Sequence, residues 1–262
     1  MSLAVAPMLA PLLGGQLETA FGWQSNFLFT ALLGGLTLIA TIQTLEETLP
    51  MEARRLTNTG ALARTYLRLS MMGKFMGYSF CTAAMGAAFQ AFLAGAPFAL
   101  IVVMAVPPEQ LGYFIMAVPI GYIIGNYISS RMSQRASRRR MIWIGGILAV
   151  VGTAVLVLLP LSGMDSPYTL IIPLAFYSCG SGFVVPNSLA GALTAVEPAA
   201  AGSAAALGGF VQMGAGFVST IIMASLVPTS FLQVGMVMFW CCVLSLLVFV
   251  LLVVPRPRAA TD

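Results

Sequence analysis

Long apolar runs separated by short polar or charged segments make up most of this chain. The runs cover residues 3–17, 26–45, 75–106, 110–130, 141–161, 168–190, 203–227 and 232–254. They are uniformly apolar and do not alternate with a period of two, which favours membrane-spanning helices over barrel strands. A helix needs about 20 apolar residues to cross the bilayer core. The pattern therefore predicts an all-α membrane protein with about eight transmembrane helices.

Composition supports this prediction and excludes several functional classes. Hydrophobic residues make up 59% of the chain and charged residues 8%, against roughly 25% charged residues in soluble domains. The sequence has no histidine, and its four cysteines lie in apolar runs without CxxC spacing, so we expect no metal site. It also lacks a GxSxG motif and a phosphate-binding loop. We therefore expect neither an enzyme nor a bound cofactor.

The basic residues predict how the chain is oriented in the membrane. All 12 follow an even-numbered apolar run, in the segments 54–74, 131–140 and 256–258. Lys and Arg that flank membrane spans stay on the cytoplasmic side. This rule places both termini and these segments in the cytoplasm. It also explains the net charge of +4 without a nucleic-acid partner.

Several segments resemble drug/proton antiporters of the major facilitator superfamily. The stretch APMLAPLLGG resembles the signature of their fifth helix, through Ala6, Pro7, Ala10, Pro11, Gly14 and Gly15. The family's Gly-Pro pair is Ala10-Pro11 here, and LEETLP at 45–50 looks like the exit of the sixth helix. FQAFLAGAPFALI at 89–101 is similar to the seventh helix of the Bcr/CflA branch. GNYISSRMSQRASRRR at 125–140 resembles the loop between the eighth and ninth helices.

This resemblance implies helices five to twelve of a twelve-helix fold. Residues 1–50 would be the last two helices of the N-terminal half, and 51–74 a cytoplasmic loop between the halves. Residues 75–254 would be the complete C-terminal bundle of six helices, followed by a cytoplasmic tail at 255–262. The first four helices of the family are absent from this sequence.

The resemblance also implies a function. The parent family exports hydrophobic or amphipathic drugs across the bacterial cytoplasmic membrane by proton-coupled antiport with alternating access. The proton gradient drives transport, and no cofactor is needed. The alternative is a non-transporting membrane fragment or subunit that docks on another membrane protein.

Polar and aromatic residues near the middle of the runs are the candidates for substrate binding. A polar group in lipid is costly when it has no partner, and it normally points into the bundle. The candidates are Phe89, Gln90, Phe92, Tyr113, Tyr122, Tyr177, Gln212 and Met213. Transporter sites are expected near the bilayer midplane. The alternative is that the amides simply hydrogen-bond to neighbouring helices.

Three runs carry small or polar residues at every fourth position. They are Ala83, Ala87, Ala91 and Gly95; Ala117, Gly121, Gly125 and Ser129; and Ala204, Gly208, Gln212, Gly216 and Thr220. Small residues at this spacing let helix backbones approach closely in lipid. A face that slides during alternating access is the alternative. We favour close packing.

The segment 125–140 is the candidate cytoplasmic loop for gating. Its candidate residues are Gly125, Asn126, Arg131, Arg135, Arg138 and Arg139. The arginines determine orientation, and they are also candidates for binding anionic lipid headgroups or for a latch to acids on another helix end.

Acidic residues are confined to the ends of the runs and the loops. They are Glu18, Glu46, Glu47, Glu52, Glu109, Asp165, Glu197 and Asp262. A proton antiporter commonly uses a buried acid, and in the family this acid is typically in the N-terminal half. We therefore expect that this polypeptide alone cannot run the coupled cycle.

Overall fold

The computed structural model describes residues 13–14, 16–45, 59–107, 110–164, 166–226 and 230–254, which are helical apart from short turns. The chain divides into two compact units, Met1–Thr59 and Gly60–Asp262. Of the predicted antiporter-motif residues, Gly14 lies in a helical turn. The others, Ala6, Pro7, Ala10, Pro11 and Gly15, lie outside the described residues.

The first unit contains one long helix, α2 (Gln24–Thr44), which has no buried residue. Its threonine side chains bond to their own helix: Thr30 donates to the carbonyl of Asn26 at 2.8 Å, and Thr41 to that of Thr37 at 2.7 Å. Because these polar groups are satisfied internally, the exposed apolar surface of α2 suits a lipid environment.

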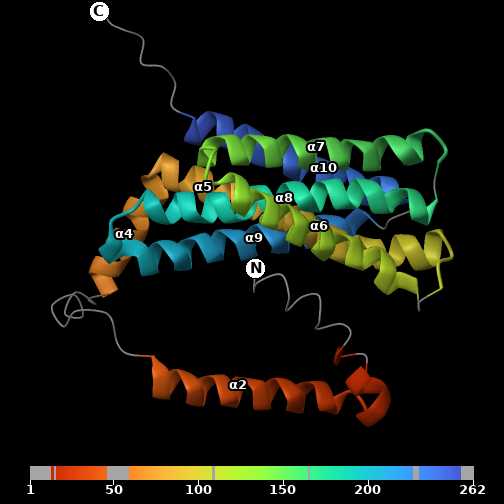
Figure 1. The fold of residues 1–262 in the computed structure, drawn as a ribbon, viewed down its shortest axis with the longest axis horizontal. Coiled ribbons are helices and arrows are strands. Elements are labelled where there is room, and N and C mark those ends of the chain that lie inside the picture. Colours follow the sequence, from red (N-terminus) through yellow and green to blue (C-terminus); the bar gives the residue numbers. More distant parts are fainter. Residues whose placement is uncertain are drawn as a thin grey trace, which may run out of the picture. The chain divides into compact units, whose positions relative to one another are not determined.

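The second unit is a helix bundle (Figure 1). Its elements are α4 (Thr59–Met71), α5 (Gly73–Phe98) with the π-helical turn η1 (Ala99–Val103), α6 (Leu111–Met132), α7 (Arg138–Leu161), η3 (Pro167–Leu170) with α8 (Ile171–Thr194), η4 (Pro198–Ala200) with α9 (Ala201–Leu226), and α10 (Phe231–Val248) with η5 (Phe249–Val253). The segment 51–74, predicted to be a loop between the halves, thus contains the helix α4.

Six described helical segments are long and apolar enough to cross a membrane: Gln24–Thr44, Gly73–Val103, Arg138–Leu161, Pro167–Thr194, Pro198–Leu226 and Phe231–Val253. The 22-residue helix α6 is a further long member of the bundle. Seven of the eight predicted runs therefore coincide with long helices, and most of the run 3–17 lies outside the described residues. The prediction of an all-α membrane protein is confirmed.

The helices of the bundle pack in two layers. Contacts between neighbours give the order α6, α8, α5, α9 in one layer, and α7 and α10 pack against each other behind α8 and α5. The same arrangement occurs twice. The helices α6 and α7 both pack against α8, and the helices α9 and α10 both pack against α5, so the contacts repeat after three helices. Such three-helix repeats are common in secondary transporters.

Glycines bring the α6 and α8 backbones together. A Cβ at Gly125 would fall on the carbonyl oxygen of Cys179, and one at Gly121 would fall on the hydroxyl of Ser178. The four residues at the predicted spacing on α6, from Ala117 to Ser129, are all buried. Close packing of this face is what the sequence predicts, because only small side chains allow helices to touch along their backbones.

The predicted small-residue face on α9 needs one correction. Ala204 and Gly216 are buried, but Thr220 is exposed and donates to its own helix, to the carbonyl of Gly216 at 3.0 Å. Ser219 takes its place and donates to the carbonyl of Ala87 on α5 at 2.7 Å. The four-residue repeat drifts from a 3.6-residue helix, so the contact moves back by one position.

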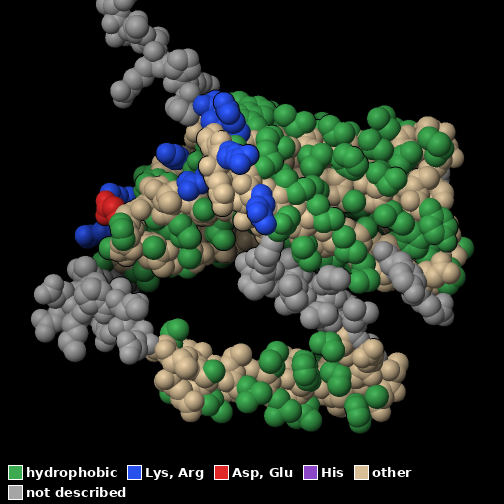
Figure 2. All heavy atoms as spheres, in the orientation of Figure 1, with side chains coloured by type: hydrophobic (Ala, Val, Ile, Leu, Met, Phe, Trp, Pro, Cys, Tyr) green, Lys and Arg blue, Asp and Glu red, His purple; other side chains and the backbone are tan. Residues whose placement is uncertain are grey.

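The described basic residues gather toward the end of the bundle that holds α4 (Figure 2). They lie on α4, at the start of α5 and around the connection between α6 and α7: Arg64, Arg68, Lys74, Arg131, Arg135, Arg138, Arg139 and Arg140. Large apolar side chains cover the outer faces of α7 and α10, such as Ile147, Leu158 and Trp240. This distribution is typical of a helix bundle in lipid.

Candidate functional site

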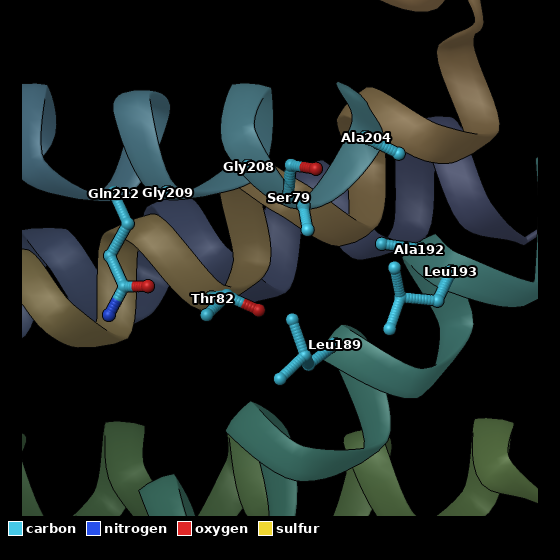
Figure 3. Close-up of a pocket in the computed structure, with 10 residues that line it drawn as sticks. Ser79, Thr82, Leu189, Ala192, Leu193, Ala204, Gly208, Gly209 and Gln212 are labelled. Carbon is cyan, nitrogen blue, oxygen red and sulfur yellow. The ribbon is translucent and has the colours of Figure 1, made fainter. Parts of the chain in front are cut away.

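A cavity of about 210 Å³ lies between α5, α8 and α9 (Figure 3). Its walls are formed by Ser79, Thr82, Leu189, Ala192, Leu193, Ala204, Ala205, Gly208, Gly209 and Gln212. None of these residues comes from α7 or α10. The cavity therefore belongs to the layer of four helices and not to the layer that packs behind it.

Small residues on α9 create this space. Ala204, Ala205, Gly208 and Gly209 fall on one face because they are spaced by one, three and four positions. A Cβ at Gly209 would have no atom within 4 Å, and one at Gly208 would approach only the hydroxyl of Ser79, at 3.7 Å. Larger side chains at these positions would occupy the cavity.

The polar groups of the cavity come from two parallel helices. Ser79 and Thr82 lie on α5 and Gln212 on α9, across from Leu189 and Leu193 of α8 (Figure 3). The Ser79 hydroxyl is buried and has no hydrogen-bond partner in the part of the chain that the structure describes. The Thr82 hydroxyl donates to the carbonyl of Tyr78 at 3.3 Å, which leaves its lone pairs free to accept. The lining contains no charged side chain.

Two glutamines interlock α5 and α9 beside the cavity. A Cβ at Gly86 would lie 3.4 Å from the amide nitrogen of Gln212, and a Cβ at Gly216 would lie 3.1 Å from Cγ of Gln90. Each glutamine therefore lies over a glycine of the other helix. Neither amide has a hydrogen-bond partner among the described residues. We call this contact the glutamine seam.

The structure places two of the predicted binding residues at or beside this site: Gln212 lines the cavity, and Gln90 lies in the glutamine seam. Phe89 is half-buried against the hydrophobic core and does not line the cavity. Tyr122 is half-buried on α6 and does not line the cavity. The side chain of Tyr113 lies outside the described residues.

Three predicted binding residues lie elsewhere. Phe92 is fully buried in the hydrophobic core. Tyr177 is also buried, and its hydroxyl donates to the carbonyl of Met85 at 2.9 Å, which links α8 to α5. Met213 is 70% exposed and does not line the cavity. Tyr177 therefore forms a hydrogen bond between helices, the role that the alternative interpretation gives to the amides.

Sequence reasoning missed Ser79 and Thr82. Together with Gly86 and Gln90 they are spaced by three, four and four residues, which places them on one face of α5. This small and polar face was a readable signal. The predicted binding residues were instead polar and aromatic residues near mid-span, whereas Ser79 and Thr82 lie near the start of α5.

The predicted gating segment connects α6 to its neighbours. Asn187 on α8 donates to the hydroxyl of Ser129 at 2.8 Å, near the end of α6. Asn126 is half-buried, and its backbone nitrogen lies 2.7 Å from where a Cβ of Gly182 would be. The ends of α6 and α8 are therefore held by a side-chain bond and a close backbone contact.

The arginines of this segment do not form the predicted latch with an acid among the described residues. Arg131 donates to the hydroxyl of Tyr127 at 3.1 Å and lies over its ring, and Arg138 donates to the hydroxyl of Thr194 at 2.8 Å. The described ion pair instead joins Arg68 of α4 to Glu197, at 3.1 Å. Arg135 and Arg139 are exposed and form no ion pair with a described acid.

Comparisons with known proteins agree with this architecture. The family model of the Major Facilitator Superfamily matches residues 1–220. Similar proteins include a bicyclomycin resistance protein homolog of Haemophilus influenzae, 26% identical over 94% of this chain, and multidrug resistance protein D of Escherichia coli, 26% identical over 84%. An uncharacterized MFS-type transporter, YdgK of Bacillus subtilis, is 28% identical over 94%. The chain spans 61% of the length of the Haemophilus and Bacillus relatives.

Proposed function

Because this chain belongs to the Major Facilitator Superfamily, we propose that it serves in the export of small hydrophobic or amphipathic molecules by alternating access. The names of two relatives, which refer to bicyclomycin and multidrug resistance, support a drug as the substrate. The relatives are bacterial, and the chain is a multi-pass membrane protein, which supports the bacterial cytoplasmic membrane as its location.

The uncharged cavity between α5, α8 and α9 is the observation that carries this proposal. Ligand pockets are mostly apolar with a few placed polar groups, and this cavity joins alanine, glycine and leucine walls to the side chains of Ser79, Thr82 and Gln212. Such a lining suits hydrophobic or amphipathic molecules better than sugars or ions. Lipid-facing surfaces of the bundle, in contrast, carry large apolar side chains.

The proposal also assigns a direction to the bundle. Basic residues mark the cytoplasmic side of membrane proteins, and here they gather at the end where α5 begins (Figure 2). Ser79 is six residues from the start of α5 at Gly73, about 9 Å along a helix that rises 1.5 Å per residue. The cavity therefore lies in the cytoplasmic part of the bundle, where a substrate for export would arrive.

Proton coupling is part of the proposal, but this cavity does not supply the proton-binding group. The lining contains no acid, and the described acids Glu18 and Glu197 are exposed. An alternately accessible acid is the common carrier of the proton in such antiporters. We therefore assign substrate binding to the bundle and proton binding to residues outside the described bundle.

To test this proposal, we would measure how much of the neutral dye Nile red accumulates in efflux-deficient cells. The cells express the 262-residue chain, or the same chain with an upstream extension that supplies a membrane-embedded acid, with membrane insertion verified for both. We expect lower accumulation with the extended chain and reversal by a protonophore. Export by the short chain alone would refute the assignment of proton coupling. Unchanged accumulation in both cases would overturn the function and favour the docking subunit.

A further inference from the structure

The cavity between α5, α8 and α9 carries hydrogen-bonding groups that no part of the described bundle uses. The Ser79 side chain is 4% exposed, and its hydroxyl has no hydrogen-bond partner among the described residues. Buried polar groups are almost always hydrogen-bonded in native structures, so an orphan hydroxyl in a cavity wall points to a missing partner. The Gln212 amide lines the same cavity and adds donors and an acceptor that no described residue uses.

Charge is the second property that selects a ligand. The ten lining residues include no Asp, Glu, Lys, Arg or His. The space is open on one side, because Leu189, Leu193, Ala205 and Gly209 are exposed. A permanently charged group that docked against the buried Ser79 and Thr82 would lose part of its hydration without gaining a counter-charge from the lining, which is more costly than the same loss for a hydroxyl or an amide. A neutral polar group would instead find Ser79, Thr82 and Gln212.

Size sets a further limit. The cavity volume of about 210 Å³ is below the roughly 300 to 1,000 Å³ of pockets that enclose drug-sized ligands. This volume would admit a small ring with one polar substituent, or one end of a larger molecule. Ala205 and Gly209 of α9 and Leu189 and Leu193 of α8 all line the cavity, so the ring would contact apolar atoms of two helices.

We propose that this cavity binds uncharged molecules, or the uncharged end of larger ones, through a hydroxyl or amide group, and that it excludes permanent cations and anions. The role of this selectivity in export rests on the function proposed above. Binding itself does not depend on that function, because it needs only the folded bundle.

Two probes of similar size separate neutral from charged ligands. Acetanilide carries a neutral amide on a benzene ring, and phenyltrimethylammonium carries a permanent positive charge on the same ring. Binding is measured for the chain in lipid nanodiscs by saturation-transfer NMR, with empty nanodiscs to subtract partitioning into lipid. We expect saturable binding of acetanilide and no saturable binding of the cation. Equal binding of both probes, or of neither, would overturn the proposal.

Variants locate the binding in the cavity. The double variant Ser79→Ala, Gln212→Leu removes hydrogen-bonding groups, and we expect about tenfold weaker acetanilide binding from the loss of two hydrogen bonds. Gly209→Val fills the space without a clash, since nothing lies within 4 Å of its Cβ position, and should abolish binding. Phe210→Leu is the matched control, because Phe210 is 75% exposed on the same helix and does not line the cavity.

The outcomes distinguish this proposal from the proposed function. Acetanilide binding that is unchanged in both cavity variants would refute the assignment of the site, provided that thermal unfolding shows them to be folded. Selective binding without any Nile red export in cells would leave the cavity assignment standing and refute the export function alone.

Discussion

Replacement of Gly125 by alanine is the sharpest test of how the bundle is held together. The added Cβ would fall on the carbonyl oxygen of Cys179 and lie 2.8 Å from the carbonyl carbon and Cα of the same residue. These atoms belong to the backbone of α8 and cannot rotate away as a side chain would. The α6 and α8 helices must therefore separate locally.

The expected loss of stability follows from the cost of overpacking. Forcing one extra carbon into a well-packed contact costs about 1 to 3 kcal/mol. For a unit of this size, each kcal/mol lowers Tm by about 2 to 4 °C, so we expect Gly125→Ala to lower Tm by about 2 to 12 °C. Gly112→Ala is the matched control on the same helix, because its Cβ meets nothing within 4 Å.

The native cysteines of the bundle can be used to follow its unfolding. Cys81 and Cys242 are buried free thiols, and Cys179 and Cys241 are half-buried free thiols. A thiol-reactive fluorogenic dye added to the protein in detergent therefore gives a signal as the bundle opens. Gly125→Ala should also speed the labelling of Cys179 below Tm, since this residue lies at the altered contact. Equal Tm values and labelling rates for the two alanine variants would refute the close approach of α6 and α8.

Three further predictions follow from the hydrogen bonds and charges of the bundle. Ser219→Ala removes a buried hydrogen bond between α9 and α5, worth about 1 kcal/mol, and should lower Tm by about 2 to 4 °C. Thr220→Ala loses only a part-buried hydrogen bond within its own helix and should lower Tm by less in the same dye assay. Arg68→Gln breaks an ion pair whose side chains are 71% and 70% exposed, so Tm should fall by less than about 2 °C, and a larger fall would show a structural role for α4. A membrane-impermeant maleimide should label Ser162→Cys in intact cells and Ser133→Cys only after permeabilisation, and the reverse result would invert the proposed orientation.

Helical spacing predicted much of the fold, because lipid imposes strong constraints. The long apolar runs identified the helices, and the small residues from Ala117 to Ser129 identified the face of α6 that packs closely. The same reasoning failed by one position at Thr220, where a strict four-residue repeat departs from the helical period. Spacing shows which residues share a face of a helix, but it does not show which neighbour the face meets.

The binding residues were harder to predict for the same reason. Tyr177 and Phe92 have the chemistry of a drug site, yet their faces of α8 and α5 turn into the core, where the Tyr177 hydroxyl is satisfied by a carbonyl of α5. The cavity instead arises from absent volume on α9, at Gly208 and Gly209. The cavity depends on how α5, α8 and α9 pack against one another, and the spacing of residues within one helix does not show which side chains of other helices it meets.

In the layer formed by α6, α8, α5 and α9, the pair α6–α8 and the pair α5–α9 are held together by different contacts, and this difference explains where the cavity lies. Glycines of α6 bring its backbone against that of α8, which leaves no room for a ligand. Between α5 and α9, in contrast, Gln90 and Gln212 keep their amides over glycines without hydrogen-bond partners. A ligand that bonds to Gln212 therefore breaks no hydrogen bond within the described bundle. Binding there costs the protein less than binding at a satisfied group, which is why a neutral polar ligand suits this seam and no site is expected between α6 and α8.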